Sequence, residues 1–195
     1  KYGSDLQTKI NVFYWGFPVE QPSKNDYLTI QNSFLNEYGI QKEDTLVVAT
    51  RGLADIYDPE NMIKIIKKLS EHSLLKIVVL RGFANNIQVA KFNDEIQDFK
   101  DKIVFIDKLL SSNELYVLYN QAKYHISIPI SDALGGGVVE PLLMGSYPIL
   151  SNIPPYQNFV LENSGYILKD YSVESIDILY QKIINEDLQV NIDGI

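Results

Sequence analysis

Short apolar runs alternate with longer amphipathic stretches along this chain from Thr45 to Ile184. The runs are rich in Val, Ile and Leu and lack an apolar–polar alternation, so they predict strands that are buried on both faces. The strands are expected at residues 46–50, 76–80, 103–106, 124–128, 147–151 and 166–168. Helices between such strands are typical of a parallel sheet that is covered on both sides. The predicted fold is therefore a doubly wound, Rossmann-like α/β domain of about six parallel strands.

The stretches between the predicted strands have the spacing and the start signals of amphipathic helices. Asp58 is expected to cap a helix in which Pro59 takes the first position, where its missing N–H costs nothing. Ser112 and Ser172 are the candidates for two further N-caps. The expected helices are at about 59–69, 86–99, from 112 onward, 137–144, 156–161 and 173–184.

The first 40 residues are less regular than the remainder. Residues 12–16 resemble an extra strand, and residues 27–38 resemble a helix that ends at Gly39. We expect residues 1–40 to form an entry segment that packs on one edge of the sheet, and residues 41–195 to form the Rossmann-like domain.

The composition excludes several kinds of function. The chain has 195 residues, a formal net charge of -8 and no Cys, which argues against a nucleic-acid partner and against thiolate or zinc-thiolate sites. An acidic protein of this kind must bind a phosphate locally, with a helix N-terminus or a placed Arg. The only histidines are His72 and His125, and His125 lies in an apolar run that favours a core position. No apolar stretch is long enough for a membrane helix.

The most informative segment is residues 127–151, which pass from a strand to Asp132, three consecutive glycines, a short helix and another strand. Glycines allow a backbone to approach a ligand, and the free N–H groups of a helix start suit an anion. Pro141 is expected in the first helical turn, which would start the helix near residue 137 or 138 and place Glu140 beside Asp132 at the same mouth. The helix dipole alone would also favour Glu140, and Asp132 would also suit a turn.

This segment resembles the signature of the C-terminal domain of GT-B glycosyltransferases in glycosyltransferase family 4 (glycosyl transferases group 1). The signature has an acidic residue, seven intervening residues and a Glu, a spacing that Asp132 and Glu140 share, with Asp in the place usually held by Glu. Residues 15–17, 50–53 and 114–119 resemble three other segments of that domain, in the same order. The resemblance extends over roughly residues 10–185.

The resemblance implies a role for each site residue. Arg51 would pair with the diphosphate and stabilise the leaving group, Glu140 would bind the ribose, and Asp132 would lie beside the transferred sugar. The further donor-binding residues are Gly52, Arg81, Lys108, Leu109, Gly135, Gly136, Gly137 and Val138. Among these, Lys108 and Leu109 would lie near the base, and the amides of residues 135–138 would hold sugar hydroxyls and diphosphate. Neither a catalytic metal nor a cofactor is implied.

One departure from the family affects the phosphate site. The family usually has a Lys five residues after the Arg, and here that position is Ile56. Either Arg51 acts alone, or Arg81 substitutes for the Lys, or donor binding is weakened.

The function implied by the resemblance is donor binding in a retaining glycosyltransferase that transfers a hexose from a nucleotide sugar to a glycan or lipid-linked acceptor. The N-terminal acceptor domain would be missing from this chain, which alone should be inactive. The resemblance further implies polysaccharide biosynthesis in the cytoplasm, peripheral to the inner membrane face through the missing domain. Two alternatives are a non-catalytic sugar-nucleotide-binding module and another GT-B enzyme such as a sugar-nucleotide epimerase.

Overall fold

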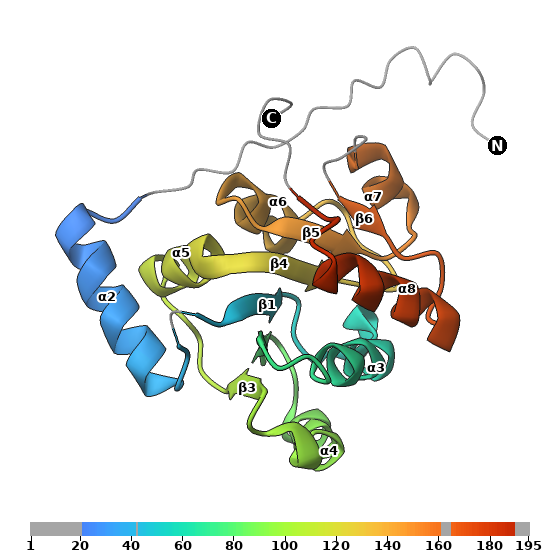
Figure 1. The fold of residues 1–195 in the computed structure, drawn as a ribbon, viewed down its shortest axis with the longest axis horizontal. Coiled ribbons are helices and arrows are strands. Elements are labelled where there is room, and N and C mark those ends of the chain that lie inside the picture. Colours follow the sequence, from blue (N-terminus) through green and yellow to red (C-terminus); the bar gives the residue numbers. More distant parts are fainter. Residues whose placement is uncertain (1–20, 42, 161–164, 190–195) are drawn as a thin grey trace.

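The computed structural model describes residues 21–41, 43–160 and 165–189. Its centre is a six-stranded sheet with the order β3-β2-β1-β4-β5-β6, in which every neighbouring pair is parallel (Figure 1). The strands are β1 (Thr45–Ala49), β2 (Leu75–Leu80), β3 (Ile103–Ile106), β4 (Ala122–Ser127), β5 (Tyr147–Leu150) and β6 (Tyr166–Ile167). The predicted doubly wound α/β fold is confirmed.

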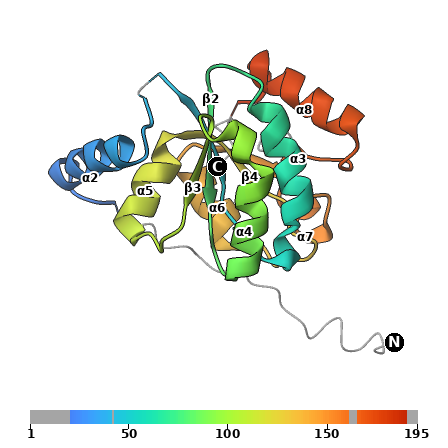
Figure 2. The ribbon, with the colours of Figure 1, turned by 90° about the horizontal axis from the view of Figure 1, so that it is seen from below.

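Helices cover both faces of the sheet. They are α2 (Lys24–Glu37), α3 (Pro59–Leu69), α4 (Asn86–Glu95), α5 (Ser112–Gln121), α6 (Gly136–Leu143), α7 (Pro154–Phe159) and α8 (Val173–Ile184), with short 3-10 helices η1 (Asp55–Tyr57) and η2 (Gln97–Phe99). Figure 2 shows α2 and α5 on one side of the sheet and α3, α4 and α8 on the other.

Each central strand contributes to two separate cores. In β1, Val47 and Ala49 pack with α3, α4 and α8, whereas Leu46 and Val48 pack with α2 and α5. Successive side chains of a strand point to opposite faces, so a strand between two helical layers needs apolar residues at every position. This requirement explains the unbroken apolar runs in the sequence.

The caps that start the helices agree with the sequence analysis in two cases and differ in one. Asp58 caps α3 with Pro59 at its first position, and Ser172 caps α8, as predicted. The prediction of Ser112 as a cap is wrong, because Ser111 holds that position. Glu114 explains the difference: it lies three residues after Ser111, and its side chain accepts a hydrogen bond from the Ser111 amide in a capping box.

The N-terminal segment packs differently from the expectation. Helix α2 lies against α5 over one face of the sheet, where Phe34 and Ile40 join the core, so the expected packing on a sheet edge is wrong for this helix. The helix ends before Gly39, whose φ of +59° lies in the left-handed region. The expected strand at residues 12–16 lies outside the described residues.

The strand order reverses between β1 and β4, and this reversal places the candidate site. The chain leaves β1 for α3 on one face, and it leaves β4 for α6, which contacts α5 on the other face. Because the two loops diverge, a crevice forms at the carboxyl ends of these adjacent strands. The loop after β1 begins with Thr50 and Arg51, and the loop after β4 contains Asp132.

His125 is a core residue of β4, as predicted. The ring is fully buried, with Nδ1 3.1 Å from the Ser146 hydroxyl and no partner for Nε2 among the described residues. Burial lowers the pKa of His125 from 6.5 to about 3. The folded protein therefore holds a neutral imidazole at neutral pH.

We expect this histidine to make stability depend on pH. The unfolded chain binds a proton below pH 6.5 and the folded chain only near pH 3, so the contribution is complete above pH 6.5 and is lost as the pH falls toward 3. Between pH 7.5 and 5.0, urea unfolding should show wild type losing about 2 kcal/mol more than His125→Gln. His72→Gln, at a partly exposed position, should behave like wild type, and an equal loss in wild type and His125→Gln would contradict the assignment.

Candidate functional site

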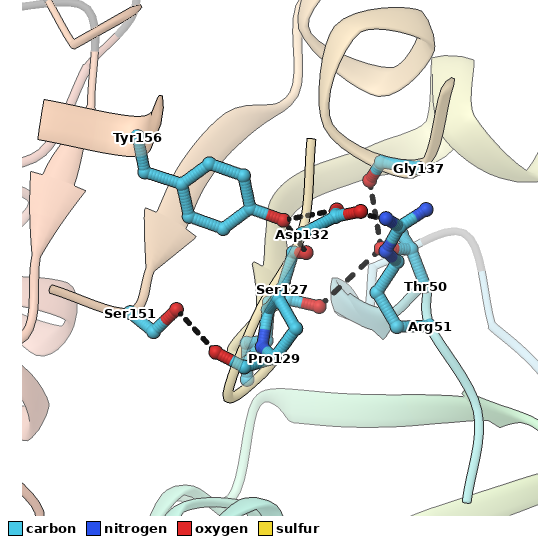
Figure 3. A network of polar contacts seen from close by, with 9 residues as sticks. Thr50, Arg51, Ser127, Pro129, Asp132, Gly137, Ser151 and Tyr156 are labelled. Atoms are coloured by element: carbon cyan, nitrogen blue, oxygen red, sulfur yellow. Dashed lines mark hydrogen bonds and ion pairs between the residues drawn. The ribbon is translucent and has the colours of Figure 1, made fainter. Parts of the chain in front are cut away.

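The loops that follow β1 and β4 meet at the strand-order reversal, beside the start of α6 (Figure 3). Arg51 comes from the first loop, Asp132 comes from the second, and the glycines of residues 135–137 open the helix. The structure therefore brings together the predicted phosphate ligand, one predicted acid and the glycine-rich turn.

Arg51 lies across the start of α6 because two positions there have no side chain. A Cβ at Gly135 would lie 3.0 Å from both terminal nitrogens of Arg51, and a Cβ at Gly137 would lie 2.8 Å from its Cδ. On its other side, the guanidinium carbon lies 5.3 Å from the centre of the Tyr57 ring, a cation–π distance. The arginine is thus held in place by packing.

Arg51 and Asp132 form an ion pair with each other in this structure. The side chain of Arg51 is 17% exposed and that of Asp132 is 15% exposed, so water screens the pair only in part. The same carboxylate oxygen of Asp132 accepts a hydrogen bond of 2.7 Å from the Tyr156 hydroxyl. The predicted ligand of the diphosphate and the predicted neighbour of the sugar therefore contact each other.

Tyr156 is a member of the site that the sequence analysis missed. It is fully buried on α7, and its hydroxyl lies 3.0 Å from the Ser127 hydroxyl at the end of β4 (Figure 3). A phenol has one hydrogen, which goes to the Asp132 carboxylate, so Ser127 donates to Tyr156. Burial raises the pKa of Tyr156 and keeps it a donor. No sequence pattern links Tyr156 to Asp132.

Pro141 ties α6 to the loop after β1. The helix begins at Gly136, so Pro141 lies in its second turn, and the expected first-turn position is wrong. Proline has no N–H, which leaves the Gly137 carbonyl without its helical donor. The Thr50 hydroxyl donates to this carbonyl at 2.7 Å and satisfies it. A proline inside the predicted helix was the signal that such a donor is needed.

Glu140 lies in the second turn of α6 and not in the first, again because the helix begins at Gly136. Its side chain is half-buried and makes no hydrogen bond or ion pair with a described residue. Burial raises the pKa of Tyr119, and the negative charge of Glu140 adds to this increase. The positive charge of Arg51 acts in the opposite direction. Glu140 and Arg51 therefore both lie near the Tyr119 phenol. The ribose contact of Glu140 stays a prediction.

Two of the four predicted amide donors lie at the open start of α6. Gly135 is the N-cap residue and has no side chain that could cap the helix, so Gly136 and Gly137 donate to no described acceptor. The Val138 amide differs, since it donates to the Gly135 carbonyl at 3.0 Å and its side chain is fully buried. The helix start can thus offer N–H groups to an anion next to Arg51.

Arg81 is already bound elsewhere. Its guanidinium pairs with Asp107 at 2.6 Å and donates to Asn86 at 2.9 Å and to the Ala84 carbonyl at 3.2 Å. Gly52 lies against its backbone, where a Cβ would be 2.5 Å from the Arg81 carbonyl oxygen. Arg81 is therefore already paired in this structure, and its substitution for the absent Lys stays a prediction.

Lys108 and Leu109 lie after β3, beyond β2 from the β1–β4 crevice. The Lys108 ammonium pairs with Glu37 at 3.1 Å and with Glu114 at 3.3 Å. The hydrogen bond that Lys108 donates to Glu37 raises the pKa of Lys108. The Leu109 side chain is 97% exposed. The predicted contacts of Lys108 and Leu109 with the nucleotide base stay a prediction.

Ile56 occupies the position of the missing Lys and lies at the rim. Its side chain is 45% exposed, and its carbonyl accepts the Ile130 amide at 2.9 Å, which places it beside the loop after β4. The position thus adjoins the crevice but carries no charge. Arg51 is the one cation that the described residues place against the glycine-rich turn.

A pocket of about 270 Å³ opens between α3, α4 and Ile130, on the other side of β1 from the glycine-rich turn. Its floor is apolar, and its acidic residues include Asp55, Asp58 and Glu60. The Lys91 side chain pairs with Glu60 at 2.6 Å, so the pocket offers a phosphate no free cation. The Arg51 crevice suits an anion better.

Metal-binding clusters and membrane-spanning helices are both absent from residues 21–41, 43–160 and 165–189. No group of three or more His, Asp and Glu side chains in these ranges could hold a metal ion. No helix in them is long and apolar enough to cross a membrane.

The fold of this chain is similar to that of solved glycosyltransferase structures. No protein-family model matches the sequence, and no curated protein matches it. The chain is similar to HepE from Anabaena solved in complex with UDP-glucose, with a TM-score of 0.70 and 14% identity over 92% of this chain and 49% of that one.

Two other solved structures share the same fold. A glycosyltransferase from Rickettsia africae has a TM-score of 0.65 and 15% identity over 87% of this chain and 48% of that one. A UDP-forming α,α-trehalose-phosphate synthase from Burkholderia xenovorans has a TM-score of 0.63 and 12% identity over 84% of this chain and 42% of that one. The chain therefore spans about half the length of these GT-B structures and has the fold of one of their domains.

We expect the Thr50 hydroxyl to stabilise the link between the β1 loop and α6. Thr50→Val keeps the shape but leaves the Gly137 carbonyl without a donor, which should lower the free energy of unfolding by about 1–2 kcal/mol. Thr50→Ser keeps the hydroxyl and should lose less. Urea unfolding of the three proteins decides this, and equal losses in the two variants would argue against the hydrogen bond.

Proposed function

We propose that this chain is the donor-binding domain of a retaining glycosyltransferase, in the manner of family 4, and that it binds a nucleoside diphosphate sugar at the Arg51 crevice. The observation that carries the proposal is the meeting of the Arg51 guanidinium with the uncapped N-terminus of α6 at the strand-order reversal. Guanidinium and helix amides together are a recurrent way of binding phosphate. The shared fold with a structure that contains UDP-glucose supports the same site.

The chemistry proposed for this domain is stabilisation of the leaving diphosphate. When the bond between the sugar and the diphosphate breaks, negative charge develops on the phosphate oxygens. Arg51 and the amides of Gly136 and Gly137 would accept this charge without rearranging, because packing already fixes the arginine. Glu140 would accept hydrogen bonds from the ribose. No metal or cofactor takes part in this proposal.

The partner surfaces of the full enzyme are also proposals. A second domain would face the carboxyl rim, bring a glycan or lipid-linked acceptor to the donor and exclude water from the cleft. Hexose transfer of this kind would belong to polysaccharide biosynthesis on the cytoplasmic side of the membrane. This chain alone should bind the donor and transfer no sugar, because transfer requires an acceptor that is held in line with the donor.

A non-catalytic sugar-nucleotide-binding module is the second candidate function. Ile56 in place of the Lys and the engagement of Arg81 by Asp107 favour it, since the diphosphate would meet a single cation. Donor hydrolysis or sugar transfer by the full-length protein would decide for the enzyme.

Calorimetric titration with UDP, GDP and ADP tests the donor site. We expect one of the three to bind with a Kd on the order of 0.1–1 mM. Glu140→Ala and Arg51→Gln should each weaken that binding by about 1.5–3 kcal/mol, because each removes a charge-assisted hydrogen bond.

The matched control is Glu174→Ala, since Glu174 is an exposed acid at the start of α8, on the opposite side of the sheet from α5. It should bind like wild type. The proposal fails if wild type binds none of the nucleotides at millimolar concentration, or if Glu140→Ala and Arg51→Gln bind them as wild type does.

A further inference from the structure

The Asp132 carboxylate occupies the face of Arg51 that a phosphate would use. It pairs with a terminal nitrogen of Arg51, while the Arg51 Nε is buried and has no partner among the described residues. The charge of Arg51 is therefore balanced by a side chain of the protein itself. A phosphate arriving at Arg51 meets a carboxylate that is already there.

Asp132 is kept in this place by a second contact. The Tyr156 hydroxyl donates to the same carboxylate oxygen at 2.7 Å, and the Ser127 hydroxyl supports Tyr156 at 3.0 Å. Both Tyr156 and Ser127 are buried, and the Tyr156 ring packs against Val138 and Leu150. The donor that holds Asp132 is thus fixed by the core.

We propose that Tyr156 is a positioning residue whose buried hydroxyl holds the Asp132 carboxylate against Arg51 as an internal competitor of the phosphate ligand. The proposal rests on the proposed function, since it concerns the same anion site. Under this proposal the crevice inhibits its own ligand binding, because a phosphate can bind only when the Arg51–Asp132 pair opens.

The competition is strong because a single cation in the crevice would be shared by two anionic groups. An incoming diphosphate and the Asp132 carboxylate repel each other, and the pair is screened only in part because both side chains are mostly buried. Ile56 supplies no second cation, and Arg81 is bound to Asp107. Removing the charge of Asp132 should therefore increase the affinity of the site for phosphate.

Two isosteric substitutions test the proposal by calorimetry, with UDP and inorganic pyrophosphate as probes. Asp132→Asn removes the charge and should lower the Kd of both probes about tenfold. Tyr156→Phe keeps the buried ring, frees the carboxylate, and should lower both Kd values about threefold. In the double variant Tyr156→Phe should add nothing, because the group through which it acts is gone.

Tyr147→Phe is the matched control. Tyr147 is also a buried tyrosine, but it packs in the core on the α3 and α8 face, away from Asp132. This variant should bind both probes as wild type does. Urea unfolding of every variant shows that a changed Kd comes from a folded protein.

The outcomes separate this proposal from the proposed function. Unchanged or weaker binding by Asp132→Asn, with wild type binding UDP, overturns the internal competition and leaves the donor site standing. A Tyr156→Phe effect that persists in the Asp132→Asn background overturns the positioning role of Tyr156. Binding by Asp132→Asn where wild type shows none supports the proposal, and absence of binding in all variants overturns it together with the anion site.

Discussion

The parallel pairing of β1 with β4 is the constraint on which the rest of the structure depends. The chain continues from these two strands to opposite faces, so their loops separate and leave a crevice at the rim. Arg51 and Asp132 meet there although 81 positions separate them in sequence. Thr50 adds a hydrogen bond to the Gly137 carbonyl, which fixes the start of α6 against the same crevice.

Much of the fold could be predicted from the sequence, because a strand buried on both faces must be apolar at each position. The run at residues 46–50 is of this kind, and it corresponds to β1 at Thr45–Ala49. Helix starts were less certain where two candidate residues are adjacent, as with Ser111 and Ser112. The capping box with Glu114 decides between them, and its spacing was readable in the sequence.

The site could be predicted only as far as local spacing reaches. The glycine-rich turn and Arg51 have recognisable local patterns, and the structure brings them together. The hydrogen bond from Tyr156 to Asp132 depends on how α7 packs under the rim, and no local pattern encodes it. The engagement of Arg81 by Asp107 is tertiary in the same way, since it joins the ends of two neighbouring strands.

The charge of the crevice connects the fold with the proposed function. One arginine, an uncapped helix start and a competing carboxylate meet at the site for which we propose weak phosphate binding. Residues 127–151, which carry the resemblance to family 4, supply both the carboxylate and the helix start. The absent Lys at position 56 and the ion pair distinguish this chain from the pattern of family 4.

The most direct measurement is a titration of the isotope-labelled chain with UDP, followed by the backbone amide signals of each residue. Our account predicts that the largest changes occur at residues 50–52 and 135–140, on both sides of the crevice. Changes centred on the pocket between α3 and α4, with none at these residues, would contradict it. So would a spectrum that does not change at millimolar UDP.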